Sequence, residues 1–379
     1  MPADVLTDRA VNRALLARQH LLAPAPAGDP GQAALDMVRQ LCGLQAQAPF
    51  PPYYGLLARL EGFRPEHLAT LLESRKVVRI ALMRSTIHLV TADDALAWRP
   101  LIQPVLDQGL ASNWGKGLAG LDLDRVAARG RELTTEQPLT SADLGAALTR
   151  TFPDHPGDAL AMAVRCRVPL VQVPPRAVWG KSGLAKHTPA DVWLDRPNPE
   201  PPADRPQALT AMIERYLAAF GPATVQDVQT WSGLTRLREI VEPVRDRLRT
   251  FTDERGRELF DLPDSPRPDP DVPAPPRLAA EFDNLILSHD DRTRVMAADD
   301  RRRLFKQLNS FPGSVLLDGF VAGAWRVKRA KSTATVTIEL FRARVPARDR
   351  DALEAEAARV LAVTAPAATP DVRFVTPAD

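Results

Sequence analysis

The chain is poor in the residues that build disulfide frameworks and zinc sites. It contains two cysteines, Cys42 and Cys166, and six histidines among 379 residues. No CxxC motif occurs, and no two histidines stand at the spacing of metal ligands. Both cysteines lie in apolar helical stretches, so we expect them to be inert core residues. The sequence therefore argues against a disulfide-stabilised fold and a zinc centre, and we expect no metal and no other cofactor.

The motifs of many enzyme classes are also missing. We find no phosphate-binding P-loop, no glycine fingerprint of a dinucleotide site, no HExxH and no GxSxG. No apolar run reaches the length that a membrane-spanning helix needs, and the N-terminal stretch lacks the apolar core of a secretory signal. We therefore expect a cytoplasmic protein without membrane contact.

The overall composition is that of a globular protein. Hydrophobic residues make up 45% of the chain, which suffices for a sizeable core. Its length predicts two or three domains. The 49 basic and 47 acidic residues leave a net charge of +2, which permits a local basic face but does not by itself indicate nucleic-acid binding.

The stretch 41–56, which reads LCGLQAQAPFPPYYGL, carries the most distinctive pattern. An apolar helical run ends at Gln45-Ala46-Gln47, and prolines follow at positions 49, 51 and 52. Side chains at i and i+2 point to the same side only in extended or turn geometry, because on a helix they diverge by roughly 200°. Since proline fixes φ, a loop that holds both amides would be stiff.

The two glutamines suit one kind of chemistry in particular. Neutral amides donate and accept hydrogen bonds, but they are poor bases and cannot be nucleophiles. The pair could orient a water molecule and turn carbonyl dipoles toward a developing positive charge. The alternative is that both side chains merely cap the end of a helix, and the pair taken alone favours that alternative.

Helices followed by a strand pair, the plan of a winged helix-turn-helix, occur three times along the chain. The first set ends in VVRIALMRSTIHLV (77–90), and the second begins at a capping box at Thr140. The third is the clearest, because Thr224 and Thr235 are expected to cap successive helices and two strands flank the turn at 253–256. The three sets match in the order of elements, not in residues, so the repeat is an architectural inference.

The last third of the chain changes character. We expect strands at 284–288, 314–317, 320–328, 335–341 and 372–375, a tight turn at Asp318-Gly319 and a helix over 349–363. A partly closed β-barrel is the natural prediction for this part. The fold class is thus α+β: three tandem winged-helix domains at 1–130, 131–200 and 201–270 and a β-barrel-like domain at 271–379. Proline-rich segments at 196–206 and 263–276 are expected to be stiff connectors between units.

Two groups of polar residues are candidates for lining a cleft or holding DNA phosphates. The first is Arg84, Thr86 and His88, which strand alternation places on one face. The alternative is that they form the exposed face of a wing.

The second group is His289, Arg292 and Arg294. These residues belong to the polar stretch HDDRTR, which directly follows the apolar stretch NLILS. Loops at the ends of strands commonly hold binding residues, and arginines there could hold phosphates. The alternative is a turn of ion pairs between these arginines and the two aspartates at 290 and 291.

The phrases LCGLQAQAP…YYGLLARL, RSTIHLVTADD, GPATVQDVQTWSGL, EFDNLILSHDDRTR and DGFVAGAWRV, in this order, resemble the AlkZ-type winged-helix DNA glycosylases of bacteria. The resemblance spans about residues 11–374. It implies tandem winged helices and a β-barrel arranged as a C-shaped clamp, and removal of N-alkylated purines, including bulky adducts and interstrand crosslinks made by natural-product alkylators. The family's catalytic motif is Gln, an aliphatic residue, Gln, which carries over to Gln45 and Gln47. Another branch has Asp as the second member, so Gln47 indicates the Gln branch.

The family chemistry agrees with the residues. An N7-alkylated purine is already cationic, so it leaves without protonation, and the protein needs only to place a water and favour a cationic sugar. We therefore expect a monofunctional DNA glycosylase acting on N7-alkylguanine in duplex DNA, in repair or in self-resistance to a genotoxic natural product. Lacking an obvious dimerisation helix, it should be a monomer. The alternatives are a non-catalytic winged-helix DNA-binding protein, such as a regulator or lesion-sequestering factor, and a protein-interaction scaffold.

Overall fold

Several helices begin at capping threonine side chains, among them the predicted caps Thr140 and Thr224. The hydroxyls of Thr91, Thr140 and Thr224 each accept a hydrogen bond from the backbone N–H three residues later. At Thr224 the Asp227 carboxylate also accepts from the Thr224 N–H, which completes a capping box. The computed structural model describes residues 4–26, 28–198, 200–305, 312–342 and 344–375.

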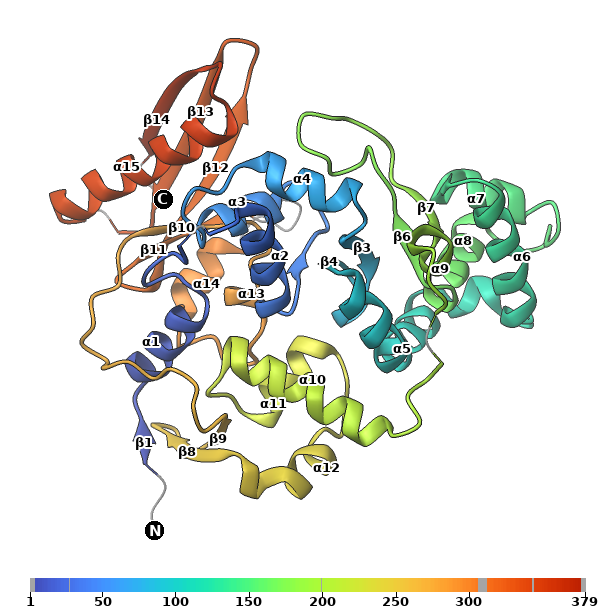
Figure 1. Ribbon diagram of the computed structural model, residues 1–379, viewed down its shortest axis with the longest axis horizontal. Helices are drawn as coiled ribbons and strands as arrows, with labels where there is room; N and C mark the ends of the chain where they lie inside the picture. The colour runs from blue at the N-terminus through green and yellow to red at the C-terminus, as the bar shows by residue number, and fades with distance from the viewer. Residues whose placement is uncertain (1–3, 27, 199, 306–311, 343, 376–379) are drawn as a thin grey trace.

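The first third of the chain is mostly helical and contains the predicted hairpin (Figure 1). Strands β3 and β4 pair antiparallel, with Val77 opposite Thr91 and Ala81 opposite Ile87. The elements are β1 (Val5–Leu6), α1 (Asp8–Arg18), α2 (Pro30–Gln40), β2 (Leu44–Gln45), α3 (Pro51–Leu57), α4 (Pro65–Glu73), β3 (Val77–Ala81), the 3-10 turn η1 (Met83–Ser85), β4 (Ile87–Thr91), α5 (Ala92–Trp114) and η2 (Gly115–Leu118).

The second part joins the first through one continuous sheet. Arg79 of β3 pairs with Gln172 of β6, so the hairpins of the first two parts form a six-stranded sheet in the order β2-β4-β3-β6-β7-β5. Adjacent strands in a sheet share backbone hydrogen bonds, so these two parts are firmly connected. The further elements are α6 (Leu123–Glu136), β5 (Leu139–Thr140), α7 (Ser141–Leu148), α8 (Gly157–Arg167), β6 (Leu170–Gln172), β7 (Lys186–Pro189) and α9 (Ala190–Leu194).

The third part contains three helices, a 3-10 turn and the predicted hairpin around 253–256. The last helix starts at Arg238, three residues after the expected cap at Thr235, and continues as a 3-10 turn. The elements are α10 (Arg205–Phe220), α11 (Val225–Ser232), α12 (Arg238–Val241), η3 (Glu242–Arg247), β8 (Arg249–Asp253) and β9 (Glu258–Asp261). Strand β1 pairs in parallel with β8 and so ties the start of the chain to this hairpin.

Helix α1 reaches from there to the C-terminal part. The Asn12 amide donates to the backbone carbonyls of Arg294 and Gly319, at 2.8 and 2.9 Å. Arg13, whose side chain is fully buried, pairs with the Asp318 carboxylate at the β11–β12 turn. The first helix therefore joins segments that lie near the other end of the chain.

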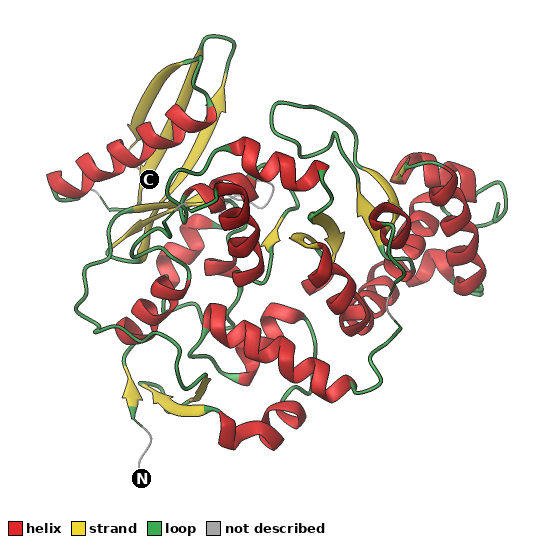
Figure 2. Ribbon diagram, viewed as in Figure 1, coloured by secondary structure: helices red, strands yellow, loops and turns green. Residues whose placement is uncertain are grey.

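The C-terminal part is an open sheet and not the predicted barrel (Figure 2). Its five strands follow the order β10-β11-β12-β13-β14, so β10 and β14 are edges. The predicted hairpin turn at Asp318-Gly319 joins β11 to β12, and β14 runs parallel to β13 after a crossover through α15. The elements are β10 (Arg277–Ala279), α13 (Asn284–Leu287), α14 (Ala298–Leu304), β11 (Gly313–Leu317), β12 (Phe320–Arg329), β13 (Thr333–Leu340), α15 (Ala347–Thr364) and β14 (Thr369–Val375).

The prediction of a strand at 284–288 is wrong. The segment forms the short helix α13, and the Asp283 side chain caps it by accepting from the Leu285 N–H at 2.9 Å. A short apolar run fits a buried helix as well as a buried strand, so periodicity alone could not decide. Among the described residues no helix is both long and apolar enough to cross a bilayer.

Buried ion pairs connect distant segments of the core. Arg59, just after α3, makes two hydrogen bonds of 2.8 and 2.9 Å to the Asp283 carboxylate, and both side chains are 1% exposed. Arg18 makes an equivalent pair with Asp261, at 2.7 and 2.8 Å. The attraction offsets the cost of removing these charges from water only while both partners are present.

Asp283→Ala should therefore destabilise the protein strongly, because it leaves the Arg59 guanidinium buried without its counter-ion. We expect a loss of about 3–5 kcal/mol and a clearly lower melting temperature by calorimetry. Glu132→Ala, which breaks the exposed Arg129–Glu132 pair, is the matched control and should cost less than about 1 kcal/mol. Equal melting temperatures for the two variants would contradict the structural role of the buried pair.

Candidate active site

The two glutamines lie on an extended segment at the edge of the six-stranded sheet. Leu44 and Gln45 form β2 and pair antiparallel with β4, where Gln45 stands opposite His88. The Ala46 N–H continues the ladder by donating to the Ile87 carbonyl at 2.7 Å. The predicted extended geometry is thus present, and both amides belong to one local segment.

The turn between α2 and the glutamine segment requires glycine. After α2 the backbone turns through Gly43, which has φ +83°, a value that favours glycine. A Cβ there would lie 2.9 Å from the Leu89 carbonyl oxygen and still closer to the Val90 side chain. Close packing of this turn on β4 is what brings Gln45 into register with His88.

Both amide oxygens are held by groups that can only donate. The Arg84 guanidinium donates to Oε1 of Gln45 at 2.8 Å, and the Ile87 N–H donates to Oε1 of Gln47 at 3.0 Å. Because neither partner can accept, the orientation of each amide follows from the hydrogen bonds. Each oxygen keeps a second lone pair, and among the described residues neither Nε2 group has a hydrogen-bond partner.

The two glutamines differ in exposure. Gln45 is 8% exposed, whereas Gln47 faces solvent. Neither caps a helix: Gln47 bonds to the backbone of the residue before His88, and α3 begins at Pro51 without a side-chain cap. The capping alternative is therefore wrong, and one amide of the pair is accessible from outside.

Arg84 connects the glutamine segment to the third part of the chain. While Nη2 donates to Gln45, Nη1 donates to the backbone carbonyl of Trp231 in α11 at 2.6 Å. Arg84 and Ser85 both have left-handed φ values, 55° and 57°, which cost about 1–3 kcal/mol each in residues other than glycine. Burial lowers the pKa of Arg84 to about 10, so the guanidinium remains charged at neutral pH.

His88 and Thr86 complete the first predicted group. The His88 ring lies 3.5 Å from both the Arg84 guanidinium and the Thr86 hydroxyl, so the structure brings the three residues together beside Gln45. Burial, followed by the Arg84 charge, lowers the pKa of His88 to about 3. The imidazole is therefore neutral at physiological pH and is a poor general acid.

The residues of this group do not form an exposed wing face. His88 is fully buried and Arg84 is occupied by protein partners, while the Thr86 hydroxyl donates to the Met83 carbonyl at 3.1 Å. Arg84 also lies on the turn η1 and not in the strand. These residues support the glutamine segment from the protein interior.

Arg79 is a supporting residue that the sequence reasoning missed. It is 2% exposed, and its Nη2 donates to the Ala46 carbonyl at 2.6 Å, between the two glutamines. Among the described residues, Nε and Nη1 of Arg79 have no partner. A lone cation within the apolar strand VVRIA was the available signal, because a buried arginine needs an acceptor.

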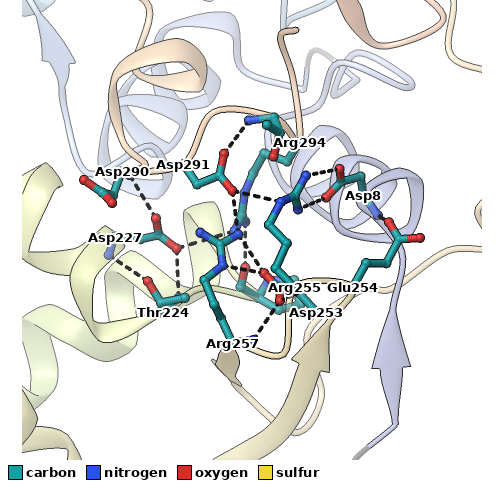
Figure 3. Close-up of polar contacts among 12 residues, drawn as sticks. Asp8, Thr224, Asp227, Asp253, Glu254, Arg255, Arg257, Asp290, Asp291 and Arg294 are labelled. Atoms are coloured by element: carbon teal, nitrogen blue, oxygen red, sulfur yellow. Dashed lines mark hydrogen bonds and ion pairs between the residues drawn. The ribbon is translucent and has the colours of Figure 1, made fainter. Parts of the chain in front are cut away.

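Two residues of the second predicted group, His289 and Arg294, are buried, and Figure 3 shows Arg294 beside Asp227. Arg294 is 3% exposed, donates to the Pro222 carbonyl at 2.7 Å and lies 3.4 Å from Asp227. His289 is 1% exposed, and its Nε2 lies 3.0 Å from the Phe220 carbonyl. The expectation that these two contact DNA is corrected here, because both side chains are buried on the third part of the chain.

The neighbouring residues of this segment also bond within the protein. Asp291 pairs with Arg257 at 2.6 Å and with Arg255 at 3.6 Å, not with the adjacent arginines as the ion-pair alternative supposed. Arg292 is half-buried and its guanidinium lies 5.5 Å from the Phe305 ring centroid. The HDDRTR segment thus fastens the third part to the C-terminal part, as Figure 3 shows for its charged groups.

Comparisons with known proteins show the family and the fold of the chain. The family model "DNA glycosylase AlkZ-like" matches residues 38–363, a range that contains every candidate residue above. The interstrand DNA cross-link repair glycosylase of Streptomyces sahachiroi is 25% identical over 348 residues, covering 84% of this chain and 89% of that protein. The solved structure of S. sahachiroi DNA glycosylase AlkZ superposes with a TM-score of 0.76 at 22% identity, covering 98% of this chain and 100% of that one, which shows a shared fold.

No group of three or more His, Cys, Asp or Glu side chains within the described ranges could hold a metal ion. The matched region includes the glutamine segment, its supporting arginines and most of the C-terminal sheet. The chain therefore belongs to the AlkZ-like family of DNA glycosylases, enzymes that hydrolyse N-glycosidic bonds in DNA.

Proposed function

We propose that the protein excises N7-alkylated purines, above all N7-alkylguanine, from duplex DNA, with Gln45 and Gln47 as its catalytic residues. The observation that carries the proposal is the pair of neutral amides, oriented by donor-only partners beside an imidazole that stays neutral. Such a site offers no strong acid. It suits a leaving group that already carries positive charge.

The two amides would divide the work. The exposed Gln47 amide can hold the attacking water through the second lone pair of Oε1, whose first lone pair is taken by the Ile87 N–H. Gln45, which is almost buried, keeps the glutamine segment in its extended geometry and adds its amide dipole near the sugar. Preorganised dipoles of this kind stabilise developing charge without reorganisation during the reaction.

The hydrogen bonds of the two amide oxygens also change the expected mechanism. The sequence suggested that both carbonyls face the sugar cation, whereas the amide oxygens bond to Arg84 and to the backbone. In our proposal the oxygens act on the sugar through the bound water. The two Nε2 groups remain available to donate to DNA oxygens.

The proposed DNA complex follows from the division of the chain. We propose three winged-helix domains, at 1–130, 131–200 and 201–270, and a C-terminal β domain at 271–379, which together clamp duplex DNA containing an alkylated purine. The hairpins β3–β4, β6–β7 and β8–β9 support these units. We further propose that the protein acts as a monomer in the cytoplasm.

Bulky adducts and interstrand crosslinks are proposed substrates as well. The support is the S. sahachiroi relative, which is named for cross-link repair. A crosslinked base cannot rotate freely into an enclosed pocket, and Gln47 lies at the surface, where the lesion needs little movement. Repair and self-resistance against a natural alkylator are both compatible with this activity.

Gln45→Ala and Gln47→Ala should each lower single-turnover excision of N7-methylguanine by about 10²–10³-fold, because each removes a preorganised dipole. Duplex affinity should change little. Gln32→Ala, on the exposed surface of α2, is the matched control and should behave as wild type. Abasic-site formation is measured by alkaline cleavage. If wild type binds lesion DNA but leaves no abasic site with methyl or bulky N7 adducts, the protein is a DNA binder without glycosylase activity.

Arg84→Ala should lower excision, because it frees Gln45 and breaks the link to the Trp231 carbonyl. It should not alter the salt dependence of DNA binding, since the guanidinium is engaged within the protein. The measurement is affinity against salt concentration by fluorescence anisotropy. A slope reduced by about one would instead mean that Arg84 neutralises a DNA phosphate.

A further inference from the structure

A pocket of about 220 Å³ opens directly beside the glutamine segment. The residues that follow Gln47 form one wall, including Pro49 and Phe50, and Tyr54 of α3 continues it. Glu281 and Arg329 lie on the opposite side. Pockets for drug-sized ligands span roughly 300–1,000 Å³, so this one fits a single fused ring system.

Aromatic rings make the wall rigid. Trp179 lies behind the pocket, with ring centroids 5.2 Å from Phe50 and 6.3 Å from Tyr54. The Arg329 guanidinium stacks on Trp179 at 4.3 Å from its centroid and donates to the Tyr54 hydroxyl. Offset and edge-on contacts of this kind hold rings in place, so a planar ligand meets a preformed surface.

Glu281 supplies the carboxylate of the pocket. It is half-buried, and its carboxylate has no hydrogen bond or ion pair among the described residues. Burial raises the pKa of Glu281, and the Arg326 charge offsets part of that rise. The Arg59–Asp283 pair two residues later anchors the backbone at this point. A half-buried carboxylate without a partner is stabilised by any ligand that brings N–H donors.

We propose that this pocket binds the alkylated guanine, with Glu281 accepting hydrogen bonds from the N1–H and the exocyclic amine of the base. This inference rests on the proposed function and adds its base specificity. If the sugar lies at Gln47, the base lies one bond away, where the pocket begins at Ala48. Extruded bases are commonly read by hydrogen bonds to the Watson–Crick edge and by stacking on aromatic side chains.

The orientation also explains how a bulky lesion fits. N7 lies on the edge of guanine opposite N1, so a substituent on N7 points away from Glu281 and out of the open mouth. Adenine presents an acceptor at N1 next to its amine, so a carboxylate can accept one hydrogen bond from it and repels the other atom. Glu281 therefore selects guanine lesions over adenine lesions.

Glu281→Gln tests the pairing without removing the side chain. An amide complements the donor and acceptor of adenine, whereas opposite the two donors of guanine, N1–H and the exocyclic amine, it can accept from only one. We expect affinity for free 7-methylguanine, measured by isothermal titration calorimetry, to fall roughly tenfold or more. Excision of 3-methyladenine relative to N7-methylguanine should rise by a similar factor. Glu61→Gln, at an exposed glutamate, is the control and should match wild type in both measurements.

The outcomes separate this inference from the proposed function. Binding of 7-methylguanine that depends on Glu281, together with no excision from any N7-alkylated duplex, overturns the glycosylase proposal and keeps the pocket. Excision that proceeds with unchanged base preference in Glu281→Gln overturns the pocket assignment and keeps the glycosylase. No saturable binding of the free base to wild type also overturns the pocket assignment.

Discussion

The contact between the Arg84 guanidinium and the Gln45 amide is the interaction on which the rest of the site depends. The Arg84 guanidinium donates to Gln45 through one nitrogen and to the Trp231 carbonyl of α11 through the other. The backbone at Arg84 and Ser85 is strained, and strain of this kind persists only where the surrounding structure enforces it. The first and third parts of the chain must therefore dock correctly before the glutamine is oriented.

The chemistry of the site follows from the reactive groups that the described residues do not place there. A neutral imidazole, two neutral amides and buried arginines give electrostatic order without a strong acid or a nucleophile. Such a site gives little help to a normal base, which leaves poorly without protonation. Selectivity for damaged DNA then comes partly from the lesion itself, because alkylation at N7 supplies the positive charge that the protein lacks.

Local patterns in the sequence predicted local features well. The caps at Thr140 and Thr224 and the turns of the hairpins depend on residues within a few positions of one another. The failures involve distant partners. Pairing of Arg79 with Gln172 merged two expected wings into one sheet, and the partners of Arg294 lie about 70 residues away, where no local pattern reveals them. The strand predicted at 284–288 was wrong for another reason, because so short an apolar run fits a buried helix as well as a buried strand.

The first helix has a consequence for how the protein is made. Asn12 bonds to the carbonyl of Gly319, a partner 307 positions along the chain, and Asp8 pairs with Arg255. A ribosome releases Asn12 long before either of its acceptors has been synthesised. Helix α1 therefore cannot form these hydrogen bonds until translation is almost complete. Contacts between such distant positions form late and slowly, so the earliest residues to be synthesised are among the last to reach their native places.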